Sequence, residues 1–239
     1  EFRGNAGGEK FQCNIADPVK HQVIDILPSR NMENLCKHFL EYPYKERAAV
    51  KKIIMDLSTL FRSVAKTIFP EAKIVADKFH VIRVVINSLE NVRKRIQKEF
   101  HATKRKWFKR SRYLLLKPEY KLTDEDKIEL ARMLNSSYDL EKAYVLKERF
   151  YEVFRKQTRT EAKKELGNWL LLAADLSLSE FRHCITTFSN WKTEIANIID
   201  ERVSNGFIEG SNNKIKVLKR ISYGVRNFDR FRNRILYLE

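Results

Sequence analysis

The fold class turns on two short apolar stretches that each end on an aspartate, Val50-Lys-Lys-Ile-Ile-Met55-Asp56 and Ala72-Lys-Ile-Val-Ala76-Asp77. Both are the length of a strand and rich in β-branched residues. Between them, Ser58 can cap a helix over Thr59–Phe69, which Pro70 would end. Because strand, helix and strand alternate, this part of the chain predicts a mixed α/β sheet.

The residues before these stretches predict further strands. Lys10–Ala16 and Gln22–Leu27 alternate roughly between apolar and polar residues, and Asp17-Pro18 lies between them. An alternating pair joined by turn residues predicts a β-hairpin. A short helix is expected next, over Glu33–Glu41.

From Phe79 onward the pattern is almost entirely helical. Apolar residues recur at helical spacing over Val81–Phe100, and Thr123 begins another helix. Further helices are predicted over Tyr138–Gln157, Glu161–Ala174 and Ser177–Ile199. We therefore expect a sheet-containing core over residues 1–100, a helical insertion over 101–200 and a returning basic segment over 201–239.

The composition favours a folded protein with a polyanionic partner. Hydrophobic residues make up 43% and aromatic residues 11% of the 239 residues, enough for one good core or two small ones. The net charge of +16 indicates nucleic acid, because cations placed on phosphates release condensed counterions. A membrane surface or solubility alone would also account for such a charge.

Targeting and redox signals are sparse. The three cysteines form no C-x-x-C pair, so we expect buried, reduced thiols of a cytosolic protein rather than a zinc or disulfide framework. No apolar run reaches the ~18–20 residues of a membrane span. The first residues include neither an initiator Met nor an apolar signal region, so we expect a chain that starts in mid-sequence or was trimmed.

Three carboxylates are candidates for chemistry. Asp56 and Asp77 end predicted strands, where α/β sheets place their ligands, and Glu209 lies on a late helix. Carboxylate oxygens suit magnesium or manganese, and a metal pair can activate an attacking oxygen while stabilising a leaving one. Taken singly, each carboxylate has a simpler explanation. Asp56 and Asp77 could cap helices, and Glu209 could be a surface residue that the helix dipole stabilises near a helix start. His80 is more commonly a packed histidine.

The stretch 204–228 predicts a helix with two different faces. Ile208, Ile215 and Leu218 form an apolar row. A polar row carries Glu209, Asn213, Lys216 and Arg220. A carboxylate that shares a face with amides and cations fits a helix between a metal site and phosphates.

These motifs together resemble the insertion-sequence DDE transposases of the IS L-three family. The resemblance runs nearly end to end and is most specific in three places. These are Phe69-Pro-Glu-Ala-Lys-Ile-Val-Ala-Asp-Lys-Phe-His-Val81, Asn205-Gly-Phe-Ile-Glu-Gly-Ser-Asn-Asn-Lys-Ile-Lys-Val-Leu-Lys-Arg220 and Tyr223-Gly-Val-Arg-Asn-Phe228. The resemblance implies an α/β, ribonuclease-H-like mixed sheet with a large all-helical insertion and C-terminal helices.

The resemblance also implies roles for the carboxylates. Asp56 matches the second catalytic aspartate, Glu209 matches the catalytic glutamate, and Asp77 matches a typical position beside the site. Asp56 and Glu209 would hold two divalent ions, magnesium or manganese. The first catalytic aspartate would come immediately before Glu1, so we expect the first strand to be missing and this chain alone to be inactive.

For the intact protein, the resemblance implies cleavage at transposon ends and strand transfer into target DNA in the bacterial cytoplasm, near the nucleoid. The partners would be double-stranded DNA and, by mechanism, further copies of the chain, with no membrane. We expect two groups of Lys and Arg side chains to contact DNA. One group follows the catalytic-helix motif, and the other lies among aromatic residues in the sequence. They are Lys214, Lys216, Lys219, Arg220, Arg226, Lys104, Arg105 and Lys106. A solvated helix face with a buried Trp107 would explain the last three equally well.

Three other functions remain open from the sequence. A catalytically inactive DNA-binding remnant, or a domesticated derivative, would keep the fold and the charge without needing a metal. A simple metal-dependent nuclease on the same fold would not explain the matches outside the carboxylates. A helical RNA-binding protein would explain the charge but not the two strands that end on aspartate.

Overall fold

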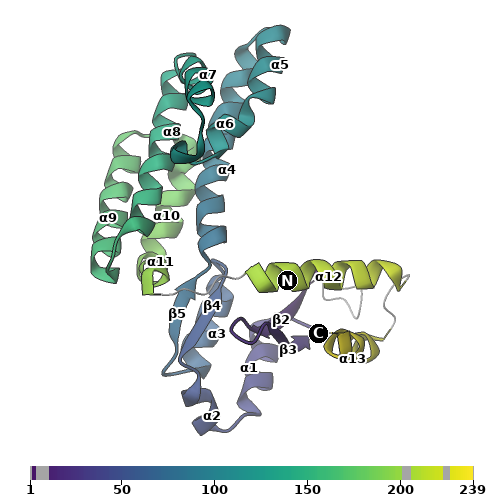
Figure 1. The fold of residues 1–239 in the computed structure, drawn as a ribbon. Coiled ribbons are helices and arrows are strands. Elements are labelled where there is room, and N and C mark those ends of the chain that lie inside the picture. Colours follow the sequence, from purple (N-terminus) through teal and green to yellow (C-terminus); the bar gives the residue numbers. More distant parts are fainter. Residues whose placement is uncertain (1, 4–10, 201–205, 223–226, 239) are drawn as a thin grey trace. The chain divides into compact units, whose positions relative to one another are not determined.

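The computed structural model describes residues 2–3, 11–200, 206–222 and 227–238, and its elements are labelled in Figure 1. The chain is α/β and mostly helical, and it divides into two compact units. The sheet unit comprises Glu1–Asp77 and Glu201–Glu239, and the helical unit comprises Lys78–Asp200. No helix within the described ranges is both long enough and apolar enough to cross a membrane.

The described strands form two sheets. In the first sheet, β1 (Phe2–Arg3), β2 (Phe11–Asp17) and β3 (Gln22–Leu27) are antiparallel in the order β1-β2-β3. In the second, β4 (Lys52–Met55) and β5 (Lys73–Ala76) pair in parallel. The predicted hairpin and both aspartate-ended strands are confirmed. Among the described residues, the two sheets are not joined into one mixed sheet.

A β-bulge in β3 orients the hairpin between two layers of helices. Ile15 pairs with Asp25 and Ala16 pairs with Val23, so Ile24 is skipped and its side chain is 56% exposed. The extra residue shifts the alternation of β3, and Val23 and Ile26 therefore point to the same side.

The helices of the sheet unit cover both faces of the hairpin. They are α1 (Met32–Leu40), α2 (Tyr44–Ala49), α3 (Thr59–Ile68), α12 (Gly206–Ile221) and α13 (Phe228–Leu238). On one face, Leu27 packs with buried apolar residues of α1 and α3. On the other, Val23 and Ile26 pack with those of α12 and α13. The sequence did not predict α2, a six-residue helix without a buried residue, because it shows no apolar periodicity.

The helical unit contains eight α-helices among its described residues. They are α4 (Lys78–Ile96), α5 (Ala102–Arg110), α6 (Arg112–Leu116), α7 (Asp124–Leu134), α8 (Tyr138–Tyr151), α9 (Arg159–Asp175), α10 (Arg182–Asn190) and α11 (Lys192–Ala196). The helix predicted over Ser177–Ile199 is divided, since the backbone leaves the helical region at Trp191. The rings of Phe150, Trp169 and Phe188 pack against one another and form part of the core of the helical unit.

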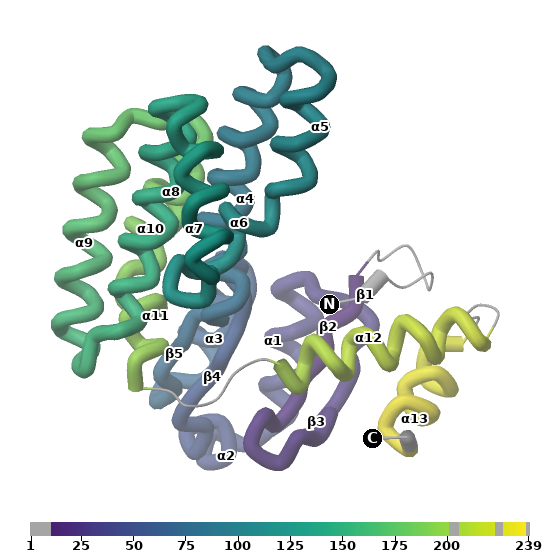
Figure 2. The backbone as a smooth tube through the Cα atoms, turned by 45° about the horizontal axis from the view of Figure 1, so that its top comes forward, coloured from purple at the N-terminus to yellow at the C-terminus, as the bar shows by residue number. Residues whose placement is uncertain are grey.

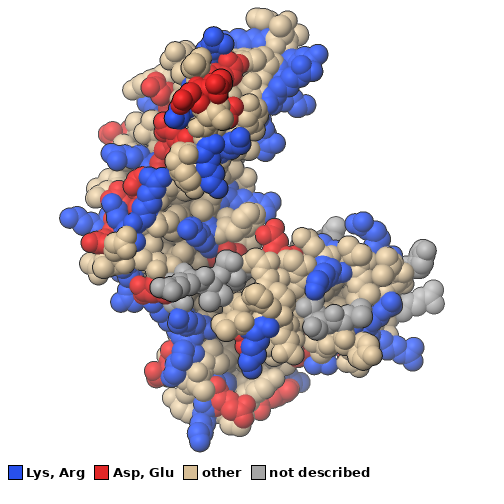
Figure 3. All heavy atoms as spheres, in the orientation of Figure 1, with Lys and Arg blue, Asp and Glu red and all other residues tan. Residues whose placement is uncertain are grey.

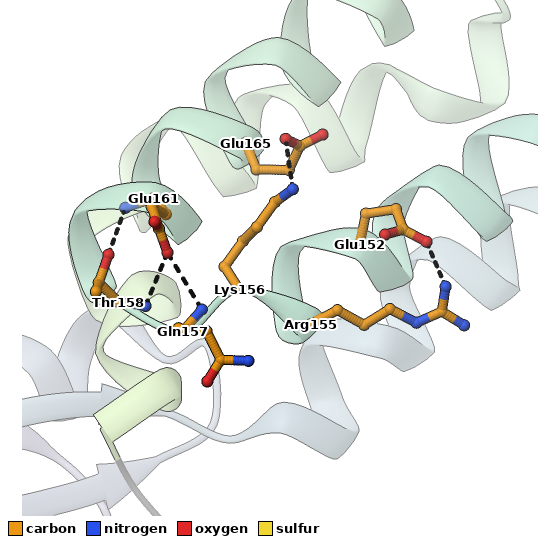
Figure 4. Close-up of polar contacts among 7 residues, drawn as sticks. All are labelled: Glu152, Arg155, Lys156, Gln157, Thr158, Glu161 and Glu165. Atoms are coloured by element: carbon orange, nitrogen blue, oxygen red, sulfur yellow. Dashed lines mark hydrogen bonds and ion pairs between the residues drawn. The ribbon is translucent and has the colours of Figure 1, made fainter.

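A capping box fixes the start of α9 (Figure 4). The Thr158 hydroxyl accepts a hydrogen bond from the backbone N–H of Glu161, and the Glu161 carboxylate accepts one from the backbone N–H of Thr158. The backbone N–H of Thr158, the Thr158 side chain and the backbone N–H of Gln157 lower the pKa of the Glu161 carboxyl, in that order of effect. An ion pair of 3.3 Å between Lys156 and Glu165 spans the same turn.

Candidate functional site

Asp56 and Asp77 lie at one edge of the parallel β4–β5 pair. The last residues of the two strands, Met55 and Ala76, are partners in the register. The backbone N–H of Asp77 donates to the carbonyl of Met55 at 2.7 Å. Both aspartates therefore leave the sheet at its carboxyl edge, where α/β proteins gather their ligand-binding groups.

The surroundings of the two aspartates differ. Asp77 is 5% exposed and directly precedes the first residue of α4, whereas Asp56 is half-buried. The simple explanation of Asp56 as a helix cap is wrong, because Ser58 caps α3 and its hydroxyl accepts a hydrogen bond from the N–H of Phe61.

The third candidate, Glu209, lies in the first turn of α12 and is exposed. The predicted apolar row is largely buried, with Ile215 at 1% and Leu218 at 8% exposure. The polar row faces solvent, as Asn213, Lys216 and Arg220 are all exposed. Among the described residues, no group of three or more His, Cys, Asp or Glu side chains is placed to hold a metal ion.

Contacts with the hairpin hold α12 along the first sheet (Figure 2). Its buried side chains pack on Val23 and Ile26. The Asn14 amide donates to the Asn212 side-chain oxygen at 3.2 Å. The His21 ring stacks on Phe207 with centroids 5.4 Å apart. Because Phe207 lies two residues before Glu209, the turn that carries the candidate glutamate packs beside the hairpin.

An ion pair that the sequence did not predict anchors α13. The Arg232 guanidinium donates to Asp25, which is 7% exposed on β3, and this hydrogen bond raises the pKa of Arg232. Arg234 donates to the Ser222 hydroxyl at 3.1 Å. Both arginines thus have structural partners. Neither could be assigned from spacing, because Asp25 and Arg232 are 207 residues apart.

The predicted DNA-contacting cations lie on two elements. On α12, Lys214, Lys216 and Arg220 are exposed and Lys219 is half-buried. Arg226 lies outside the described residues. The other predicted cations, Lys104, Arg105 and Lys106, lie on α5 of the helical unit.

The aromatic residues of α5 pack within the protein. Trp107 is half-buried and its indole N–H donates to Glu129, and Phe108 is fully buried. The ammonium of Lys104 lies 4.1 Å from the ring centroid of Phe100. These contacts favour the simpler interpretation of Trp107 as a packed residue over a base-stacking role.

The cysteines are free, as expected, but they are not equally buried. Burial raises the pKa of the Cys184 thiol to about 11, and its sulfur lies 3.2 Å from the Ser88 hydroxyl. Cys13 and Cys36 are only half-buried.

Comparison with known proteins shows one consistent family. A family model described as "Transposase", DDE_Tnp_ISL3, matches residues 1–235. The transposase for insertion sequence element IS1001 of Bordetella parapertussis is 26% identical over 94% of this chain and 56% of its own length. The transposase for IS1557 of Mycobacterium tuberculosis is 28% identical over 91% of this chain and 54% of its own. The chain thus spans about half the length of these curated relatives.

A further match has a different name. An ATP-dependent protease of Lactococcus lactis is 31% identical over 48% of this chain and 35% of its own length. No solved structure matches the chain.

Proposed function

The chain belongs to the ISL3 (IS L-three) family of DDE transposases, and from this premise we propose that it forms the catalytic part of an enzyme that cuts and joins DNA at transposon ends. The observation that carries the proposal is the register of β4 and β5, which brings Asp56 and Asp77 to one sheet edge. In a phosphoryl-transfer enzyme this edge would be the reaction centre.

The proposed fold is ribonuclease-H-like. An antiparallel hairpin, a parallel strand pair and helices on both sides of the hairpin are the parts that such a fold uses, and the described residues contain them. We further propose that residues 1–100 and 201–239 contribute the catalytic core and that residues 101–200 form the helical insertion. In the structure, the helical unit begins earlier, at Lys78.

The donor set suits a divalent cation in part. Asp56 and Asp77 offer carboxylate oxygens, the ligands that magnesium and manganese prefer, from adjacent strand ends. Asp56 and Glu209 would hold the metal, and Asp77 would lie beside it. Because Glu209 is not grouped with other ligands in the described residues, the proposal requires the first turn of α12 to approach the strand ends when metal and DNA bind.

The chain's own residues would bind and orient the reacting DNA. A bound divalent ion supplies activation of the attacking oxygen and stabilisation of the leaving oxygen. The exposed cations of α12, Lys214, Lys216 and Arg220, would hold phosphates beside Glu209. DNA of the transposon end and of the target would be the substrates, acted on by an oligomer of the chain in the bacterial cytoplasm.

The test compares carboxylate variants in the full-length protein. Asp56→Asn and Glu209→Gln should each abolish magnesium-dependent cleavage of a duplex that carries the element's terminal repeat. Asp175→Asn and Glu33→Gln remove the same charges at exposed positions on α9 and α1 and should leave cleavage unchanged. Manganese binding, measured by calorimetry, should weaken in the first pair alone.

The outcomes separate the active enzyme from the inactive DNA-binding remnant. Cleavage retained by Asp56→Asn or Glu209→Gln would contradict the assignment of that residue. A wild-type protein that binds duplex DNA but neither binds manganese nor cleaves would be the inactive DNA-binding remnant.

A further inference from the structure

A basic groove lies in the helical unit, whereas the candidate carboxylates Asp56, Asp77 and Glu209 belong to the sheet unit. It has a volume of about 490 Å³, and six of its eight lining residues are Lys or Arg. These cations are Arg93, Lys94, Lys98, Arg105, Lys109 and Arg112. We call this feature the α4–α5 groove. In Figure 3, Lys and Arg side chains gather along the α5 end of the unit.

Helical spacing explains why the cations converge. Glu90, Arg93 and Lys94 lie near the end of α4, and Gln97 and Lys98 lie in the 3-10 helix Gln97–Glu99 that follows it directly. Lys94 and Lys98 are four residues apart, which is about one helical turn. On α5, Arg105 and Lys109 are also four residues apart. Each helix thus contributes one row of side chains to the groove.

Glu90, the only carboxylate that lines the groove, is buried and already pairs with two arginines. Glu90 is 5% exposed and accepts hydrogen bonds from Arg93, which is 4% exposed, at 2.8 Å. The Nε of Arg112 lies 2.8 Å from the other Glu90 oxygen. Arg93 also donates to Gln97 at 2.6 Å. The buried Glu90–Arg93 pair is thus joined by the guanidinium of Arg112, whose side chain is 52% exposed.

The remaining four cations form an uncompensated rim. Lys94, Lys98, Arg105 and Lys109 are exposed, and no ion pair found in the described part of the chain involves them. Four exposed charges beside two guanidinium groups that share one carboxylate create a field that favours a polyanion.

We propose that the α4–α5 groove binds the sugar-phosphate backbone of duplex DNA; this rests on the proposed function, in which the chain acts on DNA. Two cations four residues apart on a helix are separated by about 6 Å along its axis. That distance covers roughly two phosphates of one strand, which rise about 3.4 Å each. None of the lining residues is aromatic, so the groove lacks the stacking surface that single strands use. Because contacts to phosphate and sugar carry no base information, binding at the groove would be independent of base sequence.

The experiment measures the salt dependence of binding to a random-sequence duplex. Lys98→Ala/Arg105→Ala removes two rim cations, one from the 3-10 helix Gln97–Glu99 and one from α5. Lys164→Ala/Arg182→Ala is the matched control, since it removes one exposed Lys and one exposed Arg from α9 and α10, outside the groove. The groove variant should lower the slope of log K against log salt by about 1.8, because each phosphate contact contributes about 0.9. The control should change the slope by much less.

Each outcome decides a separate question. An equal change of slope in both variants would overturn the proposal for the groove. A wild-type chain that does not bind duplex DNA would instead refute the proposed function. Polyglutamate serves as a competing acidic polymer. If the groove variant lost affinity for polyglutamate while its affinity for the duplex stayed unchanged, the groove would bind an acidic protein segment and the DNA proposal would fail.

Discussion

Replacing Ile215 by alanine should release α12 from the hairpin without touching a candidate catalytic residue. Ile215 is 1% exposed and packs in the cluster that joins Val23 and Ile26 of β3 to α12 and α13. Truncating a buried Ile to Ala costs about 2–5 kcal/mol, reduced by at most about 0.7 kcal/mol because alanine favours helices. The matched control is Val217→Ala on the same helix, where the side chain is 53% exposed and the cost should stay within about 0.5 kcal/mol.

Amide hydrogen exchange measures this loss where it occurs. A cost of 2 kcal/mol should speed exchange in α12 by about 30-fold, since about 1.4 kcal/mol is tenfold. The three tryptophans, Trp107, Trp169 and Trp191, all belong to the helical unit, so their fluorescence transition in urea should not move. Equal exchange in the Ile215→Ala and Val217→Ala variants would refute the role assigned to the cluster.

Three further outcomes are expected. Glu90→Gln should lower the free energy of unfolding of the helical unit by about 3 kcal/mol, because it leaves the buried Arg93 without its carboxylate. Urea titrations followed by tryptophan fluorescence measure this loss. A loss no larger than that of Glu125→Gln, at an exposed position, would contradict the prediction. Iodoacetamide at pH 8 should label Cys13 and Cys36 of the folded chain but leave Cys184 unmodified, since burial raises the pKa of that thiol to about 11, and mass spectrometry would detect a third adduct if this is wrong. Because the pKa of Glu161 is lowered from 4.5, its contribution to the stability of α9 is fully present above about pH 4.5 and is lost as the pH falls through the lowered value. An NMR titration that places the pKa of the Glu161 carboxyl at or above 4.5 would rule this out.

The sequence was sufficient for elements whose signals are local. The hairpin, β4, α3 and β5 lie within one or two residues of their predicted bounds, because strand alternation and the Ser58 cap depend on neighbouring residues alone. The two-faced character of α12 was predicted for the same reason, since Ile215 and Leu218 recur at helical spacing.

Features that join distant residues could not be predicted. The Asp25–Arg232 pair and the use of Glu90 by both Arg93 and Arg112 depend on tertiary placement. The skipped Ile24 was not predicted either, since a bulge is defined by the partner strand. For the site, the sequence identified the carboxylates that follow β4 and β5 as candidates, but whether Glu209 joins them depends on packing that no local pattern encodes.

The insertion of the helical unit into the sheet unit has a consequence for the order of synthesis. Val23 and Ile26 leave the ribosome before the helical unit, whereas the α12 and α13 side chains that cover them leave after it. At ~5–20 residues per second, the roughly 190 residues between Ile26 and Ile215 take about 10–40 s to make. During that interval the helical unit can fold from its own contiguous sequence, while one face of the β-hairpin stays uncovered. The nascent chain is therefore most exposed to mispairing before α12 and α13 emerge, and slow translation of the helical unit would lengthen that period.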